Sequence, residues 1–228
     1  MLKLSGEVLA DRKGDGINAD SLVWIAKELA KVRKAGFEIA VVVGGGNIWR
    51  YRDTKAAGIE RTTSDYMGML ATVMNGVALQ SGLEKIGVPC RVMSAIGIPQ
   101  LAERYIRQKA VRHLAKGRVL VCAGGTGNPY FTTDTAAALR AVELDCDTLL
   151  KATKVDGVYD ADPEKVKGAR RYDKLSYDEA IRKNLQVMDQ AAFALCREGK
   201  MAIRVFDMRK PNAILQAAMG KGRGTVVS

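Results

Sequence analysis

The order of apolar and polar residues predicts strands and helices that alternate along the chain. Residues 37–43 form an apolar run of strand length, as expected for a strand that is buried on both faces. Residues 20–35 instead repeat apolar positions at helical spacing, and they are followed by Gly36, a residue type that often ends helices. Such alternation is typical of a mainly parallel sheet covered by helices on both faces.

The same pattern predicts the other elements. Further strands are expected at residues 2–4, 88–93, 118–123, 148–152, 201–206 and 225–227, the last at an edge of the sheet. Further helices are expected at residues 63–86, 133–144 and 189–197. Two more should begin at the capping box of residues 176–179 and at Pro211. Because no repeat or linker interrupts the order, we expect a single α/β domain, residues 1–228, folded as a three-layer α/β/α sandwich with a mainly parallel central sheet.

The composition indicates a globular protein. With 228 residues, of which 47% are hydrophobic and 27% charged, the chain can bury a core of its own. No apolar run approaches the roughly 20 residues that cross a bilayer, and the N-terminus lacks the features of a signal peptide. We therefore expect a cytoplasmic protein without a membrane partner. The first strand has so few residues before Lys3 that we also expect some residues to precede Met1 in the natural chain.

The cysteines and histidines argue against a metal site built by the protein. The four cysteines are widely separated in apolar surroundings, and the chain has one histidine. We interpret the cysteines as small core residues in a reducing compartment, and no zinc site is expected because the ligand types are missing. The three aspartates in residues 155–163 lack the spacing of a calcium loop.

The formal net charge of +11 raises the alternative of nucleic-acid binding, since clustered Lys and Arg attract phosphates. However, the basic residues are interleaved with acidic ones, and aromatic residues make up only 6% of the chain, too few for a base-stacking surface. The densest basic stretch, residues 104–118, has helical spacing and is interpreted as a solvated helix face. We expect no nucleic-acid partner, whereas small polyanionic substrates would suit the charge.

Three glycine-rich loops each follow a predicted strand. They are residues 3–6 (KLSG), residues 44–47 (GGGN) with Arg50 nearby, and residues 124–129 (GGTGNP). Glycine lets backbone N–H groups approach an oxyanion closely, as a phosphate cradle requires. Any one of these loops could equally be a tight turn. Three of them at the carboxyl ends of strands, where open α/β sheets bind ligands, predict a phosphate-binding site.

Neither of the common nucleotide-binding signatures is present. The G-x-x-x-x-G-K-[ST] sequence of P-loop enzymes is absent, and the contiguous glycines of residues 44–46 do not fit the G-x-G-x-x-G pattern of dinucleotide-binding proteins. The chain must therefore hold phosphates by another arrangement.

Five segments, in order along essentially the whole chain, resemble the bacterial uridylate kinases, which are members of the amino acid kinase superfamily. The segments are residues 3–7 (KLSGE), 43–47 (VGGGN), 65–72 (DYMGMLAT), 125–134 (GTGNPYFTTD) and 151–163 (KATKVDGVYDADP). The resemblance implies the amino acid kinase-like fold. It also implies transfer of the γ-phosphoryl group of ATP to UMP, which gives UDP and ADP in pyrimidine nucleotide biosynthesis.

Within this resemblance three residues are implied to be catalytic. Lys3 reaches the transferred phosphoryl group, Arg50 binds a nucleotide phosphate, and Asp134 orients the lysine. Local chemistry agrees, because phosphoryl transfer depends on positioning and on neutralisation of charge by cations and backbone N–H groups. The structural alternatives are a strand-end lysine, a surface arginine and a helix-capping aspartate. Asp134 is not expected to accept a proton, because the attacking phosphate oxygen is already ionised.

The resemblance also implies two nucleotide sites, with residues 1–150 roughly the UMP-binding part and residues 151–228 the ATP-binding part. The ATP site is expected at Lys3, Leu4, Ser5, Gly6, Gly46, Arg50, Thr153, Tyr159 and Asp162. The UMP site is expected at Gly45, Asp65, Thr126, Gly127, Asn128, Pro129, Tyr130, Phe131, Thr132 and Thr133. Asp65 is implied to bind the ribose hydroxyls, with a helix cap as the alternative. Lys151 or Lys154 is expected to add positive charge near the phosphates.

The cofactor and partners follow from the same resemblance. Mg²⁺ is expected to arrive with ATP, without a dedicated protein cage. The chain is expected to form a homo-oligomer, a hexamer, with GTP as activator and UTP as inhibitor; residues 11–16 match in position the loop linked to GTP activation. One alternative is a superfamily kinase acting on acetylglutamate, aspartate or carbamate, which the uracil-type loop at residues 125–133 disfavours. Another is a non-catalytic nucleotide-binding or storage relative, which the presence of Lys3 and Asp134 disfavours.

Overall fold

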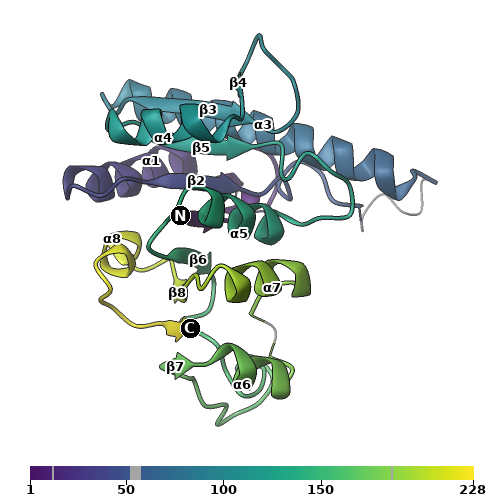
Figure 1. Cartoon of the computed structure of the whole chain (residues 1–228), viewed down its shortest axis with the longest axis vertical. Helices are drawn as coiled ribbons and strands as arrows, with labels where there is room; N and C mark the ends of the chain where they lie inside the picture. The colour runs from purple at the N-terminus through teal and green to yellow at the C-terminus, as the bar shows by residue number, and fades with distance from the viewer. Residues whose placement is uncertain (12, 52–57, 186) are drawn as a thin grey trace.

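The computed structural model describes residues 1–11, 13–51, 58–185 and 187–228, which form one nine-stranded sheet (Figure 1). Its strands are β1 (Leu2–Leu4), β2 (Ala40–Val43), β3 (Cys90–Ser94), β4 (Glu103–Arg104), β5 (Val119–Ala123), β6 (Leu149–Thr153), β7 (Lys174–Leu175), β8 (Ile203–Asp207) and β9 (Thr225–Val227). They are ordered β4-β3-β5-β2-β1-β6-β8-β9-β7, and every neighbouring pair is parallel except β8 and β9. The predicted mainly parallel sheet is therefore confirmed.

Helices cover both faces of this sheet. They are α1 (Ala19–Lys34), α3 (Arg61–Lys85), α4 (Arg107–Ala115), α5 (Thr133–Glu143), α6 (Tyr177–Arg182), α7 (Gln190–Glu198) and α8 (Ala213–Ala218), with a short 3₁₀ helix, η1, at Gly6–Leu9. One hydrophobic core lies between the sheet and α1, α3 and α8, and a second lies between the sheet and α4, α5, α6 and α7. The α/β/α layering is thus as predicted.

Alternation along β1 decides where its lysine points. Leu2 and Leu4 are 0% and 1% exposed, and both belong to the core on the α1 side. Because successive side chains of a strand point to opposite faces, Lys3 projects toward the layer that contains α5. Because Leu2 and Leu4 face the other core, the ammonium group of Lys3 lies beneath the start of α5.

The carboxyl ends of four neighbouring parallel strands lie along one edge of the sheet. In spatial order these strands are β5, β2, β1 and β6. The glycines of residues 124–127 follow β5, those of residues 44–46 follow β2, and Ser5 and Gly6 follow β1. The topology thus brings together the three loops that the sequence singled out.

Two strand predictions need correction. Residues 225–227 do not form an edge strand, because β7 pairs with β9 on its outer side. Like β4, β7 has two residues, too few to show a period in the sequence. The strand predicted at residues 37–43 begins at Ala40, where its pairing with Leu120 of β5 begins, while Phe37 packs against the core.

The basic helix α4 follows the prediction for a solvated face, since it buries Ala110 and Leu114 and leaves most of its basic side chains exposed. Among the described residues no helix has the length and apolar character required to cross a membrane.

Candidate active site

The glycine loops after β1 and β2 are in direct contact. A Cβ atom added to Gly6 would lie 2.4 Å from Asn47 Oδ1 and 2.6 Å from the carbonyl oxygen of Gly44. A Cβ atom added to Gly45 would lie 2.7 Å from the carbonyl oxygen of Gly68 in α3. Real Cβ atoms do not approach so closely, so this packing requires glycine at both positions. The loops therefore present backbone rather than side chains at the sheet edge.

A buried amide pair holds the triple-glycine loop in place. Asn75 of α3 donates to the Gly44 carbonyl oxygen at 2.7 Å and to Asn47 Oδ1 at 2.7 Å. Asn47 donates to the carbonyl oxygen of Gly16 at 2.7 Å. Because Asn47 and Asn75 are 3% and 0% exposed, these bonds are shielded from water and fix the loop against α3.

A cavity of about 150 Å³ opens beside this loop. Its walls come from the β2 and β5 loops, from α3 and from the start of α5; they include Gly45, Gly46, Asp65, Thr126, Phe131, Thr132 and Thr133. Six of these seven residues were predicted for UMP, and Gly46 was predicted for ATP. Gly127, Asn128, Pro129 and Tyr130 are not among the lining residues. The structure thus brings most of the predicted UMP residues to one cavity, with the remainder on the adjoining loop.

Two lysines meet on one carboxylate at the sheet edge. Lys3 Nζ lies 2.8 Å from Asp134 Oδ1, and Lys151 Nζ lies 2.7 Å from Asp134 Oδ2. The three side chains are 13–15% exposed. The predicted contact between Lys3 and Asp134 is therefore present. Lys151 was predicted only as one of two options, because a strand-end lysine gives no sequence signal for the face on which it lies.

The ionisation of this group follows from burial and mutual attraction. Burial alone would raise the pKa of Asp134, but Lys3 and Lys151 outweigh burial and hold that pKa below its ordinary value. Burial lowers the pKa of Lys151, and the Asp134 carboxylate opposes that effect. Asp134 is therefore ionised at neutral pH, and both of its oxygens face ammonium groups. It can orient cations but is poorly placed to take a proton.

The start of α5 explains why Asp134 is held so firmly. Thr132 is the N-cap residue, and its hydroxyl accepts from the N–H groups of Asp134 at 3.0 Å and Thr135 at 3.3 Å. The alternative that Asp134 itself caps the helix is thus wrong, because Thr132 has that role. The carboxylate is left to bind the lysines.

Arg50 and Lys154 share a different carboxylate, that of Glu7. Arg50 Nη2 lies 2.8 Å from Glu7 Oε1, and Lys154 Nζ lies 2.6 Å from Glu7 Oε2. Lys154 holds the pKa of Glu7 below its ordinary value, although burial opposes it, and Arg50 adds to the lowering. Arg50 also donates to the carbonyl oxygen of Gly46, so its guanidinium lies against the triple-glycine loop as the sequence suggested.

These residues line a second, more open cavity of about 560 Å³. Gly46 and Trp49 contribute to both cavities, so the triple-glycine loop forms the wall between them. Asp11, Lys13, Gly14 and Asp15 lie on the far wall. They belong to the loop predicted for GTP activation, of which residue 12 lies outside the described residues.

Asp65 joins helix α3 to the loop after β5. Its carboxylate accepts from Arg61 Nε at 2.8 and 2.9 Å, and Oδ2 also accepts from the Tyr130 N–H at 2.8 Å. Tyr130 has a φ of 71°, which shows how tightly this loop turns. The helix-cap alternative for Asp65 is wrong, since α3 begins four residues earlier and its N-cap is Glu60. The contact between Arg61 and Asp65 was not predicted from the sequence, because residues at i and i+4 on a helix often pair without a functional role.

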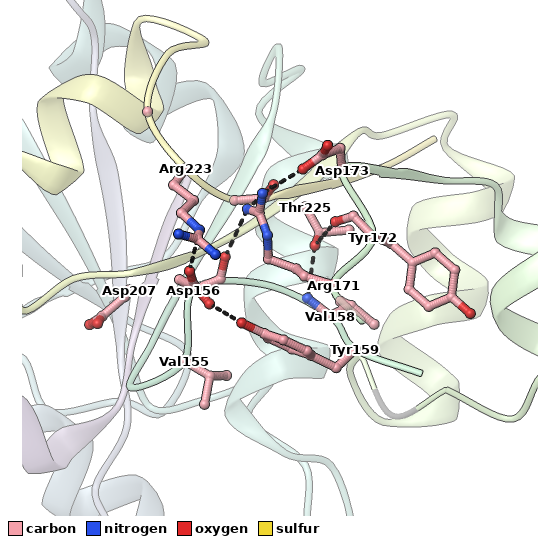
Figure 2. A network of polar contacts seen from close by, with 12 residues as sticks. Val155, Asp156, Val158, Tyr159, Arg171, Tyr172, Asp173, Asp207, Arg223 and Thr225 are labelled. Atoms are coloured by element: carbon pink, nitrogen blue, oxygen red, sulfur yellow. Dashed lines mark hydrogen bonds and ion pairs between the residues drawn. The ribbon is translucent and has the colours of Figure 1, made fainter. Parts of the chain in front are cut away.

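The segment after β6 carries the remaining predicted ATP residues. Thr153 ends β6, and its hydroxyl accepts from the Val155 N–H at 3.1 Å. Figure 2 shows Tyr159 turned toward Asp156, to which its hydroxyl donates at 2.5 Å. Asp162 lies farther out, 45% exposed and 3.4 Å from Lys165 Nζ. None of these three residues lines either cavity described above.

The C-terminal segment braces this loop. Arg223 Nε lies 2.6 Å from Asp156 Oδ2, and Arg171 donates to the carbonyl oxygens of Asp156 at 3.3 Å and Gly224 at 2.9 Å (Figure 2). A Cβ atom at Gly157 would lie 2.5 Å from Thr225 Oγ1, so the close approach of β9 requires glycine there. Residues 223–225 thus pack against the predicted ATP loop and support it.

No group of three or more His, Cys, Asp or Glu residues in the described part of the chain is arranged to hold a metal ion. The carboxylate of Asp134, at the sheet edge, already faces two lysines. Divalent cations bound through substrate phosphates keep much of their water and need few protein ligands. The residues present therefore fit a cation carried by a phosphate substrate rather than one held in a protein cage.

The chain is similar over its full length to proteins of known activity. Residues 1–207 match the model of the amino acid kinase family. The chain is 53% identical over 228 residues to the uridylate kinase of Paramagnetospirillum magneticum, covering 100% of this chain and 95% of that protein. It is 54% identical over 228 residues to the uridylate kinase of Azorhizobium caulinodans, covering 100% and 96%. The crystal structure of UMP kinase from Bacillus anthracis superposes with a TM-score of 0.96 at 38% identity, covering 100% and 94%.

Proposed function

Since the chain belongs to the amino acid kinase family and, within it, to the uridylate kinases, we propose that Lys3, Asp134 and Lys151 form the centre at which it transfers the γ-phosphoryl group of ATP to UMP. The observation that supports this assignment is the meeting of two lysines on one carboxylate, at the edge of the sheet where the glycine loops converge. The products are UDP and ADP.

The chemistry needs cations more than it needs a base. The transferred phosphoryl group spreads negative charge over its oxygens, and the acceptor is itself a phosphate. Lys3 and Lys151 supply two positive charges, and the N–H groups of Gly6, Gly45 and Gly46 supply further donors. Asp134 fixes the direction of both lysines. This division of roles explains why a carboxylate is placed between the lysines although the attacking oxygen is already ionised.

The cavity beside α3 is the proposed UMP site. Its threonines and the backbone of residues 126–133 would contact the uracil edge and the phosphate. Asp65, whose carboxylate accepts from Arg61 Nε and from the Tyr130 N–H, would bind the ribose hydroxyls. Because a wrong base would leave buried polar groups unpaired, this loop would select uracil.

ATP is proposed to lie on the opposite side of the triple-glycine loop. Lys3, Ser5, Gly6 and Gly46 would surround its terminal phosphates, and Arg50 would bind one of them. Leu4 was also predicted for this site, but its side chain is buried in the core on the α1 side. Thr153, Tyr159 and Asp162 would contact the adenosine. Mg²⁺ bound to ATP would neutralise phosphate charge, and Glu7, whose carboxylate now pairs with Arg50 and Lys154, would adjust as the phosphates enter.

Further expectations come from the family. We propose a cytoplasmic enzyme of pyrimidine nucleotide biosynthesis that forms a homohexamer, with GTP as activator and UTP as inhibitor. Association is supported by an apolar stripe on α3, where Tyr66, Leu70 and Met74 are 45%, 48% and 55% exposed. Side chains at spacing i, i+4 and i+8 share one helix face, so this stripe can pack against another copy.

A substrate panel tests the proposed function. Purified protein with ATP and Mg²⁺ is coupled to ADP detection and given UMP, CMP, acetylglutamate, aspartate or carbamate, each with and without GTP. Turnover with UMP well above the others is expected. Preference for a carboxylate or carbamate acceptor would indicate another kinase of the superfamily. Binding of UMP and ATP in calorimetry without turnover would indicate a non-catalytic relative.

A further inference from the structure

One short segment before α7 contacts both Lys151 and the start of α5, the helix that carries Asp134. The carbonyl oxygen of Val187 accepts from Lys151 Nζ at 2.5 Å. Two residues later, Asp189 bonds to the start of α5, the helix that carries Asp134. In Figure 1, α5 and α7 lie side by side on one layer of the fold. The segment therefore joins two elements that are separated along the chain by β6 and the long loop after it.

The Asp189 carboxylate is the polar link between these helices. It accepts from the hydroxyl of Thr132, and from the hydroxyl of Thr135 at 3.1 Å to each oxygen. It also accepts from the Ala192 N–H at 2.9 Å, which makes Asp189 the N-cap of its own helix. Asp189 thus caps α7 and also accepts a hydrogen bond from Thr132, the residue that caps α5.

A capping role alone does not account for these contacts. A helix N-cap needs a single acceptor for an N–H group near the start of its own helix, and serine, threonine or asparagine would provide it. Asp189 uses both oxygens, and the additional donors are 54 and 57 residues away in the sequence. In the bond between them, Thr132 is the donor and Asp189 the acceptor, because the Thr132 oxygen already accepts from two N–H groups of α5.

We propose that Asp189 is a positioning residue for phosphoryl transfer, which holds the start of α5 so that Asp134 keeps Lys3 and Lys151 aligned. This inference rests on the proposed function. Loss of the Asp189 bonds would let the first turn of α5 shift relative to β6. A displacement of about 1 Å at a reacting centre can lower a rate on the order of a hundredfold, so even a small shift should be measurable.

The charge of Asp189 adds a second effect. The charged groups near Lys151 are Asp134 on α5, Lys3 on β1 and Asp189 before α7. Burial lowers the pKa of Lys151, while Asp134 and Asp189 raise it. Removing the Asp189 charge should therefore lower the pKa of Lys151 further. The alkaline limb of the rate profile should then move to lower pH, an outcome that a purely structural helix cap would not produce.

The first test is Asp189→Asn. Asparagine keeps one oxygen for the Ala192 N–H but loses the charge and the second acceptor. We expect kcat for UMP phosphorylation to fall roughly tenfold with KM for ATP changed less than twofold, and the alkaline limb to move to lower pH. The matched control is Asp178→Asn. Asp178 is an exposed residue of α6 that pairs with Arg197 of α7, so its substitution should leave kcat and the position of the alkaline limb unchanged.

A second variant keeps the test decisive if Asp189→Asn unfolds. Thr135→Val has nearly the same volume and removes one donor to Asp189 while leaving its charge. We expect a smaller fall in kcat, roughly threefold, with no movement of the alkaline limb. Unchanged kcat in every folded variant, with an active wild type, would overturn the positioning role of Asp189. A wild type that does not phosphorylate UMP would instead overturn the proposed function.

Discussion

Two regions near the carboxyl edge of the sheet hold their charged groups in contrasting ways. Around Asp134, both partners are lysines on strands, and the three side chains are 13–15% exposed. Around Asp156, the partners lie on loops and at the C-terminal segment, and Arg223 is 62% exposed (Figure 2). Strands and helices position side chains more exactly than loops do, and shielded pairs are less weakened by salt. The first region suits a reacting centre, and the second suits a nucleotide-binding loop that can adjust.

The largest effect is expected from Lys3→Ala. This change removes one of the two cations of the rigid region, so kcat should fall on the order of a thousandfold. The fold should persist, because Lys151 still pairs with Asp134. Steady-state kinetics and a thermal melt measure the two quantities, with exposed Lys34→Ala in α1 as the control. Turnover within threefold of wild type would remove Lys3 from the reacting centre.

A smaller effect is expected from Gly45→Ala, which tests the wall between the two nucleotide cavities. The new Cβ atom would lie 2.7 Å from the Gly68 carbonyl oxygen and 2.9 Å from Ala71 Cβ, so the loop must move away from α3. We expect KM for UMP to rise roughly tenfold and stability to fall by about 1–3 kcal/mol. Gly97→Ala, where a Cβ atom meets nothing within 4 Å, is the matched control. An unchanged KM would show that the cavity does not bind UMP.

The same contrast explains what the sequence could predict. Buried strands and the glycine loops after them leave local patterns, so the sheet edge could be predicted from the residues. The pair Lys3–Asp134 was predicted only through the family resemblance, because no local pattern links the two positions. The bonds from Thr132 and Thr135 to Asp189 depend on how α5 packs on α7, and no local pattern encodes that packing. Strands of two residues, such as β7, are too short for periodicity, so residues 225–227 were wrongly placed at the edge.

The smallest effect is expected in the second region, from Arg223→Ala. In its ion pair with Asp156 the Arg223 side chain is 62% exposed, and pairs that solvent reaches in this way are worth about 0–1 kcal/mol. Asp156 still accepts the hydrogen bond from the Tyr159 hydroxyl, so the loop should loosen rather than unfold. We expect KM for ATP to rise about two- to threefold, with kcat nearly unchanged.

The control for this substitution is Arg197→Ala, which breaks an exposed pair with Asp178 away from the loop. Because salt screens exposed charges, the difference in KM between wild type and Arg223→Ala should shrink as KCl is raised. If KM for ATP does not respond to Arg223→Ala at low salt, Tyr159 and the loop around it do not contact the nucleotide. A response that persists unchanged at high salt would mean that Arg223 acts through packing rather than through its charge.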